Sequence, residues 1–266
     1  MSLLSRVVHP IEWLRAVARS DVPRAALVSE SASALAALAD EPNDLLLACR
    51  RLLDRHTEVG ALWSACARMV SAADPLAEAR AIQADMASDQ VGLNLTVDLP
   101  DAATVTVVGA GELAVELSER RGDVRILVAA DEGHSAGSTD DAVVVVPALG
   151  LGAAVAASDV VLLEAWAVGT KSFLAAQGSR TAAVLAHHAV PSGGTRDATV
   201  WLAVGVGQRL PNALFEAMRR RVVASHTEPW SARADLLDMA FVDRVVEPVA
   251  IGCPVPPELL QPHTSR

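Results

Sequence analysis

The fold of this chain is signalled by one segment, residues 104–114, which is Thr104-Val105-Thr106-Val107-Val108-Gly109-Ala110-Gly111-Glu112-Leu113-Ala114. Its β-branched run predicts a buried strand, and the Gly-x-Gly that follows predicts a tight turn into a helix. Glycines let a ligand approach the backbone, and the free N–H groups of a helix N-terminus attract anions. The segment is therefore typical of a nucleotide- or phosphate-binding turn, with a turn that binds nothing as the alternative.

The segments that follow this turn alternate between strand and helix patterns. We predict strands near 104–108, 124–129, 142–146, 159–163 and 200–204, and helices near 111–120, 149–157, 171–188 and 211–222. From residue 10 to about 90, apolar residues recur at helical spacing instead. The sequence thus predicts an α/β fold: an N-terminal helical subdomain (1–97) and a Rossmann-like parallel-sheet domain (98–266), with the ligand crevice at the carboxyl ends of the strands.

Composition excludes several classes of function. The chain is 52% hydrophobic and only 3% aromatic, so its core is built mainly from Ala, Val and Leu. A net charge of −10, with Lys171 as the only lysine, argues against nucleic-acid binding. The apolar stretch 142–157 is too short to cross a bilayer as a helix, and the first residues do not follow the signal-peptide pattern. We therefore expect a cytoplasmic protein without membrane contact.

The residues that commonly bind metals are poorly placed to do so. Cys49, Cys66 and Cys253 are widely spaced, which fits neither a disulfide framework nor a zinc pattern. His187 and His188 are adjacent on a predicted helix and so point in different directions. We expect buried structural thiols, no metal site and no cofactor.

The turn also matches the dinucleotide pattern Gly-x-Gly-x-x-Ala. Asp131 and Glu132 end the next predicted strand, which is where a dinucleotide fold binds ribose. This leaves an NAD(P)-dependent oxidoreductase open. Against it, the chain contains no tyrosine, and no hydride-transfer apparatus is recognisable.

Several segments resemble, in order, one superfamily: 55–57 with 60–63, 109–114, 128–137, 159–168 and 182–191. It comprises the initiation factor 2B alpha, beta and delta subunits, methylthioribose-1-phosphate isomerase and ribose-1,5-bisphosphate isomerase. Arg55-His56-Thr57 looks like its Arg-Pro-Thr segment, and residues 159–168 are similar to its strand ending in Gly-Ala-Asp-Ala-Val. The resemblance spans most of residues 45–250. It implies the fold, a phosphorylated sugar or nucleotide as ligand, and a homodimer.

The departures from this family concern the reaction. Its isomerases use a cysteine in the turn and the aspartate of Gly-Ala-Asp for proton transfer, and these positions are Val108 and Trp166 here. Neither side chain can act as a general acid or base. The Asn-Lys-Ile-Gly-Thr motif falls near 175–179, where only Gly178 remains. We therefore expect a divergent, non-catalytic member that acts in regulation or assembly. A sugar-phosphate aldose–ketose isomerase is the alternative.

The sequence predicts a small set of site residues. Candidates for ligand binding are Gly109, Ala110, Gly111, Glu112, Asp131, Arg55 and Lys171. Glu164 and Glu132 are the carboxylates that could support chemistry, although Glu164 could equally pair with an arginine. Because the carboxyl ends of parallel strands lie at one edge of the sheet, we expect the turn, Asp131 and Trp166 to face one crevice, with the indole at its floor.

Overall fold

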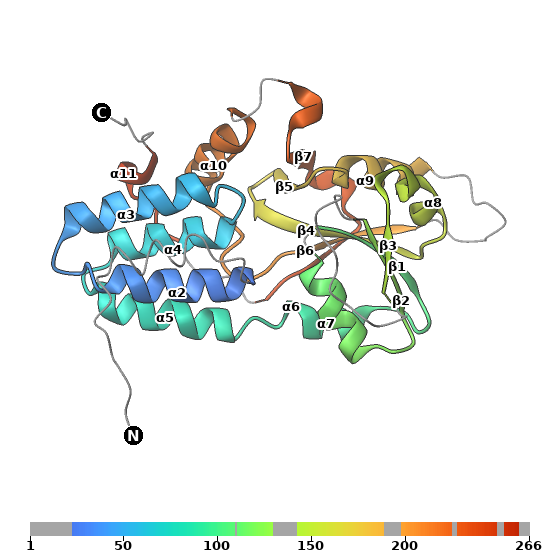
Figure 1. Cartoon of the computed structure of the whole chain (residues 1–266), viewed down its shortest axis with the longest axis horizontal. Coiled ribbons are helices and arrows are strands. Elements are labelled where there is room, and N and C mark those ends of the chain that lie inside the picture. Colours follow the sequence, from blue (N-terminus) through green and yellow to red (C-terminus); the bar gives the residue numbers. More distant parts are fainter. Residues whose placement is uncertain are drawn as a thin grey trace.

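A computed structural model describes residues 23–109, 111–129, 143–188, 198–224, 228–248 and 253–260. A layer of helices lies beside an α/β sheet with its own helices (Figure 1). The chain is therefore an α/β protein with a helical N-terminal part, as its periodicity predicts.

The described N-terminal part holds the helices α2 (Arg24–Ala36), α3 (Pro42–Arg55), α4 (Gly60–Ser71), α5 (Pro75–Ala87) and α6 (Val91–Asp98), of which α2 to α5 form the helical layer. Proline opens α3 and α5, where its missing N–H costs no hydrogen bond. The Asp74 carboxylate caps α5 by accepting a hydrogen bond from the Ala77 N–H (3.0 Å). Helix α4 lies at the centre of the layer, and its Trp63 is fully buried.

Among the described residues, six parallel strands form the main sheet in the order β3 (Val143–Val146), β2 (Arg125–Ala129), β1 (Thr104–Val108), β4 (Val160–Val168), β6 (Thr199–Ala203) and β8 (Arg244–Val246). From β1 the chain proceeds to one side through β2 and β3, and from β4 to the other side. The strand order therefore reverses between β1 and β4, which are paired up to Val108 and Leu163. In open α/β sheets such a switch point is the usual ligand site.

The helices that belong to the sheet part are α7 (Glu112–Arg120), α8 (Leu151–Ala156) and α9 (Ser179–His188). Two more follow along the chain, α10 (Asn212–Ala224) and the short α11 (Pro257–Leu260). Helix α7 follows the Gly-x-Gly turn directly. Gly111 caps it with a left-handed backbone (φ 81°), a conformation that glycine adopts without strain.

The predicted helix at 171–188 is wrong over residues 171–178. Strand β4 continues to Val168 and turns into β5 (Ser172–Ala176), which pairs antiparallel with β4 and with β7 (Ala234–Asp238). The helix begins only at Ser179, after Gly178 (φ 94°). A short apolar run looks the same in a buried strand and in a buried helix, and here strand partners on both sides decide the outcome.

The C-terminal part of the chain completes the helical layer. Leu214, Phe215 and Met218 of α10, together with Leu259 of α11, belong to the same apolar cluster as Trp63. Conversely, α6 packs with the sheet, because its Leu95 lies in the cluster around β1. The domain division at 97/98 stays a prediction from the sequence. Helix α6, which precedes it, packs with the sheet, and helices α10 and α11, which follow it, pack with the helical layer.

We predict that Trp63→Ala lowers the free energy of unfolding by about 3–5 kcal/mol, because it removes a fully buried indole from the centre of the helical layer. Trp230→Ala is the matched control. Trp230 is 73% exposed, so its replacement should change stability by less than about 0.5 kcal/mol. Urea denaturation of both variants measures the difference, and similar midpoints would contradict the packing described.

Candidate functional site

A cavity of about 270 Å³ lies at the switch point between the helical layer and the carboxyl ends of the strands. The helical layer contributes Arg24, Met86 and Asp89 to its wall, and the sheet part contributes Glu112, Glu164 and Gln208. We call it the switch-point pocket. Its position agrees with the crevice predicted from the strand pattern.

Glu164 lies against the Gly-x-Gly turn. A Cβ atom added to Gly109 would be 2.7 Å from the Glu164 carboxyl carbon and its Oε2. The Glu164 residue is only 3% exposed, although it lines the pocket. Absence of a side chain at Gly109 is therefore what lets the carboxylate approach the backbone at the end of β1.

Arg24 ties the start of α2 to two acids of the sheet part. Its Nη1 is 3.6 Å from Glu164 Oε2, and its backbone N–H donates to Glu112 Oε1 (3.3 Å). Of the two roles left open for Glu164, the structure shows the arginine pair. Sequence reasoning missed Arg24, because a residue at a helix start carries no signal for a partner so far along the chain.

Asp89 fixes another wall of the pocket. Its Oδ1 accepts from the Val91 N–H (3.0 Å), and its Oδ2 accepts from the Val206 N–H (2.8 Å) after β6. Next to it, Gln208 Oε1 accepts from the Gly205 N–H. The Asp89–Val206 hydrogen bond joins the helical layer to the loop at the end of β6. Sequence reasoning had no signal for Asp89 either.

The described lining of the pocket is acidic. Four carboxylates, those of Asp89, Glu112, Glu116 and Glu164, face a single cation, Arg24. Like charges repel at these distances, so this balance disfavours a phosphate group near the turn.

Trp166 does not form the floor of the pocket, contrary to expectation. It lies two residues beyond Glu164, past the last β1 pair, where the helical layer covers β4. The indole is 9% exposed and packs in the apolar cluster of that layer. The strand also has a register shift between Ala165 and Ala167.

The remaining candidates are dispersed. Arg55 is an exposed residue at the end of α3, and Lys171 is exposed in the β4–β5 turn; neither is among the residues that line the described pockets. Ala110, Asp131 and Glu132 lie outside the described residues. The structure thus brings together Gly109, Glu112 and Glu164, and adds Arg24.

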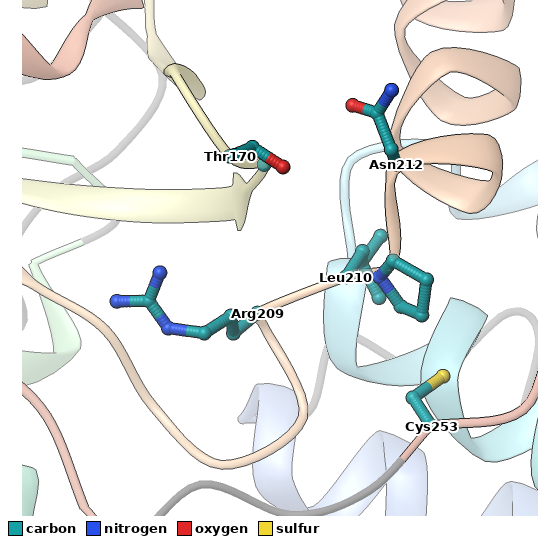
Figure 2. Close-up of a pocket in the computed structure, with 7 residues that line it drawn as sticks. Thr170, Arg209, Leu210, Asn212 and Cys253 are labelled. Carbon is teal, nitrogen blue, oxygen red and sulfur yellow. The ribbon is translucent and has the colours of Figure 1, made fainter.

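A second hollow, of about 410 Å³, opens between the β4–β5 turn and the start of α10. Figure 2 shows Thr170 and Asn212 on one side of it, and Arg209 and Cys253 on the other. Arg209 pairs with Glu247 (2.6 Å). Burial raises the pKa of the Cys253 thiol, so this thiol stays protonated at neutral pH and is a poor nucleophile.

The other thiols are structural, as expected. Cys49 and Cys66 are fully buried, and the pKa of Cys66 is raised by its hydrogen bond with Cys49 and by burial. Within the described ranges, no group of three or more His, Cys, Asp or Glu side chains could hold a metal ion. No helix in the described part of the chain is long and apolar enough to span a membrane.

No protein-family model and no curated protein matches the sequence. Solved structures do match. eIF2B beta from Chaetomium thermophilum superposes with a TM-score of 0.65 at 13% identity, over 89% of this chain and 85% of that one. The chain has the fold of an eIF2B subunit. A chain of the tetrameric eIF2B beta2-delta2 complex from the same organism superposes with a TM-score of 0.65 at 15% identity, over 89% of this chain and 88% of that one.

A further solved structure supports the same assignment. The translation initiation factor eIF-2B of Pyrococcus horikoshii OT3 superposes with a TM-score of 0.64 at 11% identity, over 95% of this chain and 98% of that one. The eIF2B-like fold therefore covers nearly the whole chain, which confirms the fold that the sequence resemblance implied. Identities this low show the fold and leave the activity to be argued from the site.

We predict that Gly109→Ala destabilises the protein by about 1–3 kcal/mol, because its new methyl group meets the buried Glu164 side chain, including Cβ at 2.8 Å. Gly92→Ala is the control. The three atoms nearest to its methyl group would be those of the Glu116 carboxyl group, the far end of a flexible, partly exposed side chain that can turn away, so stability should stay nearly unchanged. Thermal unfolding compares them, and equal losses would refute the assigned contact.

Proposed function

We propose that this chain is a non-catalytic eIF2B-like protein that acts in regulation or assembly. The observation that carries the proposal concerns two positions. By the sequence resemblance, the isomerases have a thiol and a carboxylate there. Val108 and Trp166 occupy them, and both are buried in apolar clusters. A fold shared with eIF2B subunits along nearly its full length supports the role, while the general acid and base are missing.

A phosphorylated sugar or nucleotide is the ligand class that the turn and the resemblance suggest. It would share the switch-point pocket with the Glu164 carboxylate and three further acids. Assembly is therefore the better supported part of the proposal. The oxidoreductase alternative gains nothing from the pocket, since its ribose-binding candidate, Asp131, lies outside the described residues.

An edge of the sheet is suited to assembly with a second copy. Within the described ranges β3 pairs only with β2, so its outer edge takes no strand. Val144 and Val145 of this strand are 37% and 47% exposed, and nearby Leu149 is fully exposed. An uncharged edge of valines offers free backbone groups and apolar surface to a partner strand. We propose a homodimer through the sheet part on this basis.

We predict that light scattering gives a solution mass of twice the 27.7 kDa chain and that Val145→Lys reduces it to the single-chain value. A lysine at the edge strand opposes strand addition by its charge and hydration. Leu76→Lys is the control: Leu76 is 48% exposed on α5 of the helical layer, so its replacement should leave the dimer intact. A monomeric wild-type protein would refute the homodimer.

We also predict that the purified protein converts neither methylthioribose 1-phosphate nor ribose 1,5-bisphosphate. Isomerisation moves a proton or hydride between adjacent carbons, and valine and tryptophan cannot take part in such a transfer. A coupled assay or NMR of the sugar carbons measures turnover. Turnover at an enzymatic rate that disappears in Glu164→Gln would favour the isomerase alternative instead.

A further inference from the structure

Two arginines lie close together where α3, α10 and α11 meet. Arg50 of α3 donates from its Nη2 to the carbonyl oxygen of Glu258 in α11 (2.8 Å), and α11 lies against both α3 and α10 (Figure 1). Arg221, in the last turn of α10, has its Nη1 3.1 Å from Oδ1 of Asp54 in α3. Since Arg50 and Asp54 are four residues apart on one helix, they share the face of α3 that Arg221 approaches.

The guanidinium group of Arg221 lies over a buried aromatic ring. Its central carbon is 4.9 Å from the centre of the Trp63 ring, and that indole is fully buried. The Arg221 side chain is only 16% exposed, and burial lowers the pKa of this arginine. Asp54 opposes the shift in pKa, whereas Arg50 adds to it by repulsion between like charges. The two guanidinium groups are therefore near enough to oppose each other's charge.

Several donors of this arginine pair have no acceptor. Nη1 and Nη2 of Arg221 and Nε of Arg50 are buried, and none makes a hydrogen bond within the described part of the chain. Nη1 is within ion-pair distance of Asp54 but makes no hydrogen bond to it. Buried N–H groups are almost always hydrogen-bonded, so three such nitrogens on two neighbouring cations indicate an acceptor from outside the described chain. Asp54 is 46% exposed, which opens this cluster to solvent.

We propose that Arg50 and Arg221 form a binding site for a phosphate group, which enters from the side of Asp54 and takes the place of that carboxylate. A phosphate group has more acceptor oxygens than a carboxylate and can accept from two guanidinium groups at once. The site is separate from the switch-point pocket, whose acidic lining repels phosphate. It is also independent of the assembly role, since phosphate binding and dimer mass are measured separately.

Equilibrium dialysis of the full chain against radiolabelled inorganic phosphate, at constant ionic strength, measures this binding. The wild type should bind phosphate saturably. Arg50→Gln and Arg221→Gln should each weaken binding by about ten-fold or more, because each removes a positive charge and its donors. Asp54→Asn should strengthen binding about two- to five-fold, because phosphate then no longer competes with a carboxylate at Arg221.

Arg51→Gln and Arg220→Gln are the matched controls. Each removes the same charge from the exposed neighbouring position of the same helix, so both variants should bind phosphate like the wild type. A wild-type protein that binds no phosphate would overturn the proposal. Equal weakening in the controls and in the two site variants would also overturn it, because a diffuse charge effect would then explain the binding.

Circular dichroism verifies that each variant is folded. If an arginine variant unfolds, Asp54→Asn keeps the test decisive, because this side chain is partly exposed and its replacement leaves both arginines in place. Unchanged or weaker binding by Asp54→Asn would refute the exchange of phosphate for the carboxylate.

Competition experiments identify the source of the phosphate group. Acetate that displaces phosphate at equal concentration would refute a phosphate site. Displacement by ribose 5-phosphate or AMP at lower concentration than inorganic phosphate would support the site and assign it to a larger metabolite. If neither compound displaces it, the site is one for inorganic phosphate.

Discussion

The burial of strand β4 is the constraint on which the rest of the structure depends. All nine of its residues are buried, and it pairs with β1 and β6 in parallel and with β5 in antiparallel orientation. A buried strand requires partners for every backbone N–H and C=O group, so these neighbours must be in place for β4 to be stable. Its middle residue is Glu164, which lines the pocket, and the residues after it pack against the helical layer.

The two layers meet at the second half of β4. Helix α4 begins there with Gly60, where a Cβ would lie 2.2 Å from the carbonyl oxygen of Trp166. Only glycine permits such a close approach of helix and strand. With α4 in this position, the Trp166 indole is enclosed by the apolar cluster of the helical layer. Trp166, which the sequence resemblance equates with a catalytic carboxylate of the isomerases, is part of the core here.

The same arrangement determines the chemistry of the pocket. Glu164 is the one carboxylate of β4, and it pairs with Arg24 across the two layers. Asp89, another lining residue, is held by hydrogen bonds from two backbone N–H groups. An acidic lining of this kind repels anions, so it disfavours the approach of a phosphate group.

Local features were predictable from the sequence because they depend on neighbouring residues. The valine run before Gly109 identified β1, the two glycines identified the turn, and alternating strand and helix patterns identified the parallel sheet. The strand at 172–176 was missed, because its apolar run pairs with segments that only the tertiary structure brings alongside. The Arg24–Glu164 pair and the enclosure of Trp166 were likewise decided by packing between distant segments, for which a single sequence carries no periodic signal.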